Sequence, residues 1–181
     1  MVYLLLADGF EEAEALVTAD LLRRGGCSVA LTGVKHLQVT GAHLITVTAD
    51  LTVDQADPGD MELVILPGGL GGVKGIRSST AAMGLIRTAV VQGTPVAAIC
   101  AAPTVLAGLG LLDGRKAVCY PGMEHEMGKA EMQLGAPVVT DGPFITGEAA
   151  GSVFDFGLKL VELLKGSAAA EEVRHAVHYR R

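Results

Sequence analysis

Short runs of consecutive apolar residues alternate along this chain with longer segments in which apolar residues recur every three or four positions. The short runs are typical of strands buried on both faces, and the longer segments are typical of amphipathic helices. This alternation predicts an α/β fold with a doubly wound, mostly parallel sheet covered by helices. Strands are predicted at Val2–Ala7, Cys27–Thr32, Leu63–Leu66, from Val96 up to Cys100, near Cys119, around Val138–Thr140 and at Phe144–Thr146, and helices at Glu11–Arg24, Thr80–Val91 and Gly151–Lys165.

The segment from Gln38 to Thr52 departs from this pattern, because β-branched and polar residues alternate on both sides of Thr40-Gly41. It predicts a small hairpin or an excursion at the edge of the sheet. No internal repeat, low-complexity tract or linker interrupts the chain, so a single domain over residues 1–181 is expected. In such a fold the functional site lies outside the carboxyl ends of the parallel strands.

The run Val96-Ala97-Ala98-Ile99 leads directly into Cys100, and Pro103 follows at a position suited to the start of a helix. A strand that turns abruptly into a helix forms a nucleophile elbow, which holds one side chain at the edge of the sheet beside backbone N–H groups. The positive potential of the helix N-terminus favours thiolate over thiol and lowers the pKa of a cysteine there. Cys100 is therefore the candidate nucleophile, and the alternative is a small buried hydrophobic residue.

Two further turns are expected to meet this elbow. Asp8-Gly9 and Pro67-Gly68-Gly69 each follow a predicted parallel strand, so they reach the same crevice as Cys100. The N–H groups of Gly68, Gly69 and Ala101 are candidates for binding a developing oxyanion. The alternative for the glycine pair is a tight strand-to-helix turn that binds nothing.

Acidic residues open the first predicted helix, where Glu11 and Glu12 complement the helix dipole. Glu14 differs from them, because the alanines on either side of it indicate a surface that turns inward beside the crevice. Burial and a neighbouring thiolate both raise the pKa of a carboxyl group, so Glu14 is expected to keep its proton and to donate a hydrogen bond to the sulfur. Cys100 and Glu14 would then act as a nucleophile and a proton shuttle.

Composition and charge argue against several other classes of protein. Lys and Arg number 14 against 20 Asp and Glu, a formal net charge of -6, and this balance disfavours binding to nucleic acid. No apolar run approaches the ~18 residues of a membrane span, and the apolar N-terminus lacks the basic leader of a signal peptide. The glycine-rich run from Gly69 to Lys74 lacks the third glycine of a dinucleotide fingerprint and is no Walker motif.

Cysteine usage indicates a reducing compartment. Cys27, Cys100 and Cys119 are odd in number and far apart, which suggests neither a disulfide framework nor a zinc site. The expected location is therefore the cytoplasm, and Cys27 is expected to be a core residue.

The motifs together resemble the ThiJ/PfpI superfamily, within it the branch of the parkinsonism-associated DJ protein and its bacterial thiol-chaperone relatives. The resemblance covers nearly the whole chain, and its motifs are specific in combination. They are Gly9-Phe10-Glu11-Glu12-Ala13-Glu14, Ile65-Leu66-Pro67-Gly68-Gly69, Ala98-Ile99-Cys100-Ala101-Ala102-Pro103, Tyr120-Pro121 and Gly151-Ser152-Val153-Phe154-Asp155-Phe156.

The resemblance implies a flavodoxin-like sandwich, a homodimer, an oxidisable Cys100 paired with a protonated Glu14, and backbone contacts from Gly68, Gly69 and Ala101. It places Tyr120 in the pocket, where the animal branch carries a histidine, so a Cys–His dyad is not expected.

Two other departures from the family pattern bear on the site. Ala101 stands where the protease-like branch has histidine, which argues against proteolysis and glutamine amide transfer. Glu148-Ala149-Ala150-Gly151 replaces the usual Arg or Gln followed by Gly-Pro-Gly, which puts pocket contacts from that loop in doubt. His43 and His125 are the histidines that can approach the site, with a surface role favoured for both.

The resemblance implies an enzyme that acts on reactive α-oxoaldehydes such as methylglyoxal, or on their early adducts, without a metal, glutathione or other cofactor. Cys100 would add to the aldehyde carbon and Glu14 would relay protons, as in a glyoxalase or deglycase. The alternative is a redox sensor or thiol-regulated chaperone whose Cys100 is oxidised to a sulfinate. The sequence does not separate the two.

Overall fold

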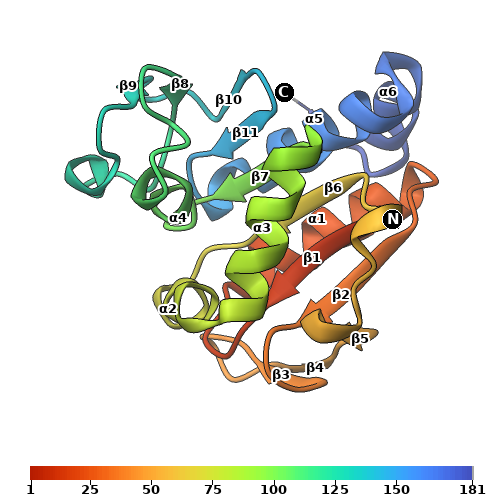
Figure 1. The fold of residues 1–181 in the computed structure, drawn as a ribbon. Coiled ribbons are helices and arrows are strands. Elements are labelled where there is room, and N and C mark those ends of the chain that lie inside the picture. Colours follow the sequence, from red (N-terminus) through yellow and green to blue (C-terminus); the bar gives the residue numbers. More distant parts are fainter. Residues whose placement is uncertain (181) are drawn as a thin grey trace.

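A seven-stranded sheet forms the centre of the computed structural model, which describes residues 1–180 (Figure 1). The last residue of the predicted domain, Arg181, lies outside the described residues. Neighbouring strands are parallel except β10 and β11, which confirms the predicted α/β fold with a mostly parallel sheet. The strand order is β10 (Val138–Asp141), β11 (Phe144–Gly147), β7 (Val96–Ile99), β6 (Leu63–Leu66), β1 (Val2–Leu6), β2 (Val29–Gly33) and β5 (Leu51–Thr52).

Helices cover both faces of this sheet (Figure 1). One face packs against α1 (Glu12–Arg24) and α5 (Val153–Lys165), and α6 (Ser167–Ala176) packs on α5. The other face packs against α2 (Leu70–Ser78), α3 (Thr80–Gln92) and α4 (Pro103–Gly108). The doubly wound arrangement therefore has two apolar layers, one on each side of the strands.

Strand β1 shows why the apolar runs are continuous. Val2, Leu4 and Leu6 face the layer of α1 and α5, whereas Tyr3 and Leu5 face the layer of α2, α3 and α4. All five side chains are buried, as expected when successive residues of a strand point to opposite and equally covered faces.

The Gln38–Thr52 segment forms both of the structures that its pattern left open. Strands β3 (Gln38–Thr40) and β4 (Thr46–Thr48) pair as a separate antiparallel hairpin, and β5 then joins the edge of the main sheet. The turn of this hairpin lies against the start of α1, because the backbone N–H of Ala42 donates to the Phe10 carbonyl over 2.8 Å.

Two helices were not predicted. The run from Pro67 to Gly72 was interpreted as a turn only, yet α2 begins at Leu70, and its glycines are explained by packing. A Cβ at Gly72 would lie 2.8 Å from the Phe10 Cα, and one at Gly75 would lie 2.6 Å from the Ala7 Cβ. Helix α6 lacks a continuous apolar stripe and buries only Val173, so the spacing of its apolar residues did not predict a helix.

The segment between α4 and β10 carries little regular structure. The strand expected near Cys119 is β8 (Lys116–Ala117), which pairs with β9 (Glu131–Met132) outside the main sheet. Short 3-10 helices occur here and elsewhere: η1 (Val53–Gln55), η2 (Pro58–Asp60), η3 (Glu124–Glu126) and η4 (Ala150–Ser152). Within residues 1–180, no helix has the length and apolar character needed to cross a bilayer.

Candidate active site

Cys100 occupies the predicted sharp turn between β7 and α4. Its φ of 66° lies in the left-handed region, which is uncommon for a residue with a side chain and costs of order 1–3 kcal/mol. Two backbone hydrogen bonds hold this conformation: the Cys100 N–H donates to the Gly147 carbonyl over 3.0 Å, and the Tyr120 N–H donates to the Cys100 carbonyl over 2.8 Å. The structure therefore shows a nucleophile elbow, with a thiol that is only partly buried.

Two of the three N–H groups predicted to bind an oxyanion act on the sulfur of Cys100. The N–H groups of Gly69 and Ala101 interact with the Cys100 sulfur and favour its ionised form. The Gly68 N–H has a different partner, since it donates to the Glu14 carboxyl oxygen Oε2 over 2.7 Å. Gly68 therefore orients Glu14 and does not serve as the expected oxyanion donor.

Glu14 is buried beside the thiol, with 1% of its surface exposed. Its second oxygen, Oε1, is buried and has no conventional hydrogen-bond partner among the described residues, while the Cys100 side chain acts on its protonation. Gly68 lies between the two groups, and a Cβ there would come within 2.5 Å of Glu14 Oε2 and 2.7 Å of the Cys100 Cβ. The absence of a side chain at Gly68 is what allows the carboxyl group and the thiol to meet.

The charge balance of this pair corrects one expectation. Burial raises the pKa of Glu14 to about 7, as predicted in direction. Burial, followed by the charge of Glu14 and its hydrogen bond, raises the pKa of Cys100 to about 12, although the N–H groups of Ala101 and Gly69 act in the opposite direction. The prediction of a thiol with a lowered pKa was therefore wrong for the resting pair.

The pair behaves as one acid near neutral pH. Above about pH 7 it carries one negative charge and one shared proton. Glu14 is the cause of two of the three effects that raise the pKa of Cys100. A thiolate would form near neutral pH if the thiol proton passed to Glu14, because the neutral carboxyl would no longer repel the sulfur and could donate a hydrogen bond to it.

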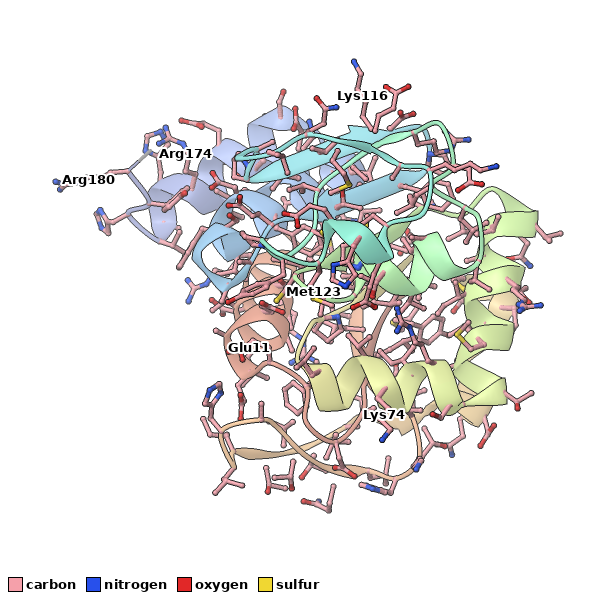
Figure 2. All side chains as sticks on the ribbon, turned by 90° about the vertical axis from the view of Figure 1, so that its left-hand side faces the viewer. Glu11, Lys74, Lys116, Met123, Arg174 and Arg180 are labelled. Carbon is pink, nitrogen blue, oxygen red and sulfur yellow. The ribbon has the colours of Figure 1, made fainter. Side chains whose placement is uncertain are left out.

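The elements that build this site meet at the carboxyl edge of the sheet. Figure 2 faces this edge, with Glu11 at the start of α1 and Met123 beyond α4 on the same side of the molecule. The Glu11 N–H donates to the Gly68 carbonyl over 3.0 Å, which ties the start of α1 to the turn after β6. The predicted convergence of the turns after β1, β6 and β7 is thus present.

The other residues considered from the sequence differ in burial and in their contact with Cys100. The side chain of Tyr120 is 48% exposed, and the residue contacts Cys100 through its backbone N–H. Cys119 is buried, and burial raises its pKa to about 11. Cys27 is buried in the layer of α1 and α5, as expected for a core residue, and His125 is exposed on η3.

His43 belongs to a cluster that fixes the hairpin. Its backbone N–H and its Nδ1 donate to the two carboxylate oxygens of Glu12, over 2.6 and 2.8 Å, and Nδ1 lies 3.6 Å from Glu11. Ligand atoms of Glu11, Glu12 and His43 all lie within 4.8 Å of one another, as at a metal site. The contacts to His43 already satisfy Glu12, and they explain the cluster as an ion pair that holds the hairpin on α1.

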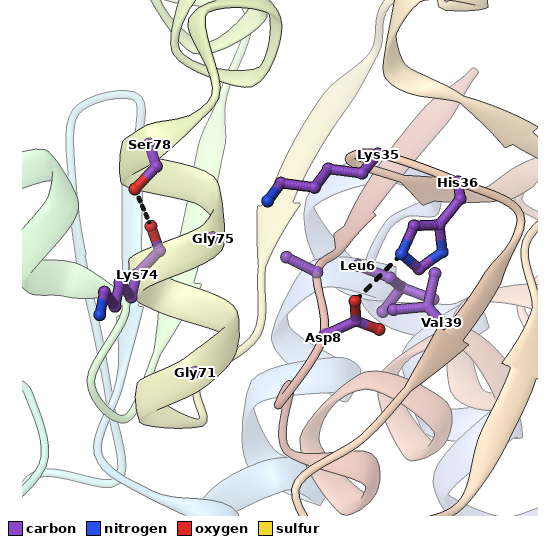
Figure 3. Close-up of a pocket in the computed structure, with 10 residues that line it drawn as sticks. Leu6, Asp8, Lys35, His36, Val39, Gly71, Lys74, Gly75 and Ser78 are labelled. Carbon is purple, nitrogen blue, oxygen red and sulfur yellow. Dashed lines mark hydrogen bonds and ion pairs between the residues drawn. The ribbon is translucent and has the colours of Figure 1, made fainter.

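A separate cavity of about 230 Å³ lies between α2 and the loop after β2 (Figure 3). Leu6 and Val39 form part of its apolar lining, and His36 Nε2 lies 3.0 Å from the Asp8 carboxylate. Lys35 extends towards α2 in this view. Neither Cys100 nor Glu14 lines this cavity, so it is distinct from the candidate active site.

Sequence reasoning missed two polar residues beneath the elbow, Arg77 of α2 and Thr104 of α4. Thr104 is buried and donates to the Ala101 carbonyl, and Arg77 donates to Thr104. Arg77 and Thr104 are 27 positions apart, so no local motif connects them.

The fold and the elbow define an α/β protein with a cysteine nucleophile at the carboxyl edge of a parallel sheet. The DJ-1/PfpI family model matches residues 1–163, and the chain belongs to that family. Protein DJ-1alpha of Drosophila melanogaster is 36% identical over 177 residues, which are 96% of this chain and 82% of the relative. A protein of Pyrococcus abyssi named a deglycase is 32% identical over 165 residues, 91% of this chain and 99% of the relative.

Solved structures agree with this assignment. DJ-1beta of Drosophila melanogaster has a TM-score of 0.94 at 33% identity, and the match covers 99% of this chain and 98% of that chain. Toxoplasma gondii DJ-1, described as oxidized, has the same TM-score at 31% identity and the same coverage of both chains. These likenesses confirm the resemblance and the flavodoxin-like fold that it implied.

Proposed function

We propose that this protein is a cofactor-free enzyme acting on reactive α-oxoaldehydes such as methylglyoxal, or on their early adducts with amines and thiols. The observation that carries the proposal is the burial of Glu14 against a partly exposed thiol, with the pKa of Glu14 raised to about 7. A general base is most effective when its pKa lies near the working pH. Relatives named deglycases support a substrate of this class.

The first step would be attack of the Cys100 sulfur on the aldehyde carbon. As the C–S bond forms, the thiol proton passes to Glu14, and the carbonyl electron pair moves to oxygen. The N–H groups of Gly69 and Ala101, which act on the sulfur, would stabilise this oxyanion. The product of the step is a hemithioacetal, formed once the oxyanion takes the proton from Glu14.

The second step would move a proton between the two substrate carbons. Ionised Glu14 removes the proton on the former aldehyde carbon, which gives an enediolate, and returns it to the neighbouring carbon. The hydroxyl proton of the former aldehyde carbon moves to the oxygen of the neighbouring carbon. The result is a thioester of Cys100 with a hydroxy acid. Water hydrolyses this thioester, so the sum of the steps is the addition of one water to methylglyoxal and the release of lactate.

The direct test is turnover of methylglyoxal in a buffer free of amines and thiols, with lactate as the measured product. The wild type and the Cys119→Ser control are expected to form lactate. Cys100→Ser is expected to be inactive, and Glu14→Gln is expected to bind substrate and turn it over at least ~100-fold more slowly. Turnover that persists in Cys100→Ser would overturn the proposal.

A second candidate is a redox role in which Cys100 is oxidised to a sulfinate. It is favoured by the partial exposure of Cys100, whose sulfur interacts with two N–H donors, and by the solved relative described as oxidized. A redox protein without turnover would give no lactate in the assay above, and peroxide would add 32 Da to the peptide that contains Cys100.

We also propose that two copies of the chain associate. Leu44 and Ile45, at the tip of the β3–β4 hairpin, are 85% and 52% exposed, which is unfavourable for an isolated apolar pair. Sedimentation equilibrium is expected to give twice the chain mass, and Leu44→Lys with Ile45→Lys is expected to give the mass of one chain.

A further inference from the structure

The elbow rests on a chain of three polar contacts that run beneath it. The hydroxyl of Thr104, which is 1% exposed, lies 2.6 Å from the Ala101 carbonyl oxygen. A guanidinium nitrogen of Arg77 lies 2.6 Å from the same hydroxyl. The Thr104 backbone N–H also points at the Ala101 carbonyl, over 3.3 Å.

The direction of these hydrogen bonds is fixed by chemistry. Arginine has five N–H donors and no acceptor, so Thr104 must accept from Arg77. The single hydroxyl proton of Thr104 is then left for the Ala101 carbonyl. Arg77 thus prevents the hydroxyl from rotating towards another acceptor.

Arg77 also supports the segment that holds the other side of the turn. Its second terminal nitrogen lies 3.7 Å from Glu126 of η3. The segment leading into η3 carries Tyr120, whose N–H donates to the Cys100 carbonyl. That carbonyl and the Ala101 N–H belong to one planar peptide unit and point in opposite directions, so holding one end aims the other.

We infer that Arg77 and Thr104 are positioning residues that keep the Ala101 N–H directed at the Cys100 sulfur. Thr104 donates to the carbonyl of the peptide that follows Ala101, and the Tyr120 N–H donates to the carbonyl of the peptide that precedes it. Arg77 contacts both supports, so its loss loosens two successive peptide units. The charge that acts on Cys100 comes from Glu14, so Arg77 acts through geometry.

This inference rests on the proposed function for the nucleophilic role of Cys100, but its test does not require turnover. The test is the rate of alkylation of Cys100 by iodoacetamide as a function of pH, read by peptide mass spectrometry. Arg77→Met and Thr104→Val each remove the polar contacts while keeping most of the side-chain volume. Thr104→Ser keeps the hydroxyl, and Arg87→Met removes an exposed arginine of α3 as the matched control.

Both Arg77→Met and Thr104→Val are expected to alkylate at Cys100 about tenfold more slowly at neutral pH, with the profile moved to higher pH, because an N–H donor to the thiolate is misplaced. Thr104→Ser and Arg87→Met are expected to match the wild type. Unchanged profiles in both Arg77→Met and Thr104→Val would overturn the inference. If Thr104→Val fails to fold, the half-exposed Arg77 position decides the question alone.

Failure of the two proposals would look different in this experiment. A wild-type Cys100 that reacts no faster than Cys119 would contradict the proposed nucleophile itself. A reactive wild type with equally reactive variants would contradict only the positioning role.

Discussion

The buried carboxyl group of Glu14 predicts that stability falls as the pH rises through neutrality. In the unfolded chain this group loses its proton near its ordinary pKa of 4.5, whereas in the folded chain it keeps the proton up to about pH 7. Between these values the folded state binds one more proton than the unfolded state. The free energy of unfolding contributed by Glu14 is therefore lost as the pH increases, at about 1.4 kcal/mol for each pH unit.

The expected total is roughly 3 kcal/mol, the difference between 4.5 and about 7 at that slope. Glutamine at position 14 removes the titration and keeps the shape, since its carbonyl oxygen can still accept the Gly68 N–H. Relative to Glu14→Gln, the wild type should lose roughly 3 kcal/mol of stability between about pH 4.5 and about pH 8. Titrating groups that do not interact with Glu14 contribute equally to both proteins and cancel in the difference.

The assay is urea unfolding followed by circular dichroism at half-unit steps of pH, for the wild type, Glu14→Gln and the exposed-position control Glu172→Gln. The control should follow the wild type at every pH. A constant difference between the wild type and Glu14→Gln across this range would refute the reasoning, because it would mean that Glu14 titrates alike in the folded and unfolded chains.

Three further predictions follow from single contacts. Gly68→Ala should lower stability by about 2 kcal/mol or more and suppress alkylation of Cys100, since its Cβ would overlap Glu14, whereas Gly84→Ala, with nothing within 4 Å, should be neutral or slightly stabilising in thermal unfolding. The hydrogen bond to Glu12 raises the pKa of His43, so its imidazole proton signals in NMR should titrate above 6.5, and the midpoint should fall towards 6.5 in Glu12→Gln. The stability from that pair is complete between 4.5 and 6.5; it is lost as the pH rises through the higher folded-state pKa of His43, and again as the pH falls through the lowered pKa of Glu12. Buried Cys119 should react with iodoacetamide much more slowly than Cys100, and equal rates would contradict the burial that the structure gives it.

The parts of the fold that the sequence predicted are those with strong local signals. Continuous apolar runs such as Leu63–Leu66 can be satisfied only in a sheet covered on both faces, and the bounds of β6 match that run. The α2 helix was not predicted because glycine has a low helix propensity. Gly72 and Gly75 of α2 are needed because they lie too close to Phe10 and Ala7 for a side chain to fit. The need for those glycines exists only after folding.

The candidate active site also has features that local sequence predicts and features that depend on tertiary packing. Cys100 was visible because a strand, a cysteine and a proline occur in immediate succession, and Glu14 because small apolar residues flank it. Glu14 accepts the hydrogen bond from the Gly68 N–H because of how α1 packs beside β6, and no local sequence pattern encodes that packing. The raised pKa of Cys100 has the same origin, because burial and the distance to Glu14 are properties of the assembled fold.

The central claim is that Glu14 and Cys100 share one proton, and the pH dependence of Cys100 alkylation tests it most directly. The account predicts that the wild-type rate rises with a midpoint near pH 7, where the pair loses its first proton, and that this rise is absent from Glu14→Gln below pH 9. Identical profiles in the two proteins would contradict it.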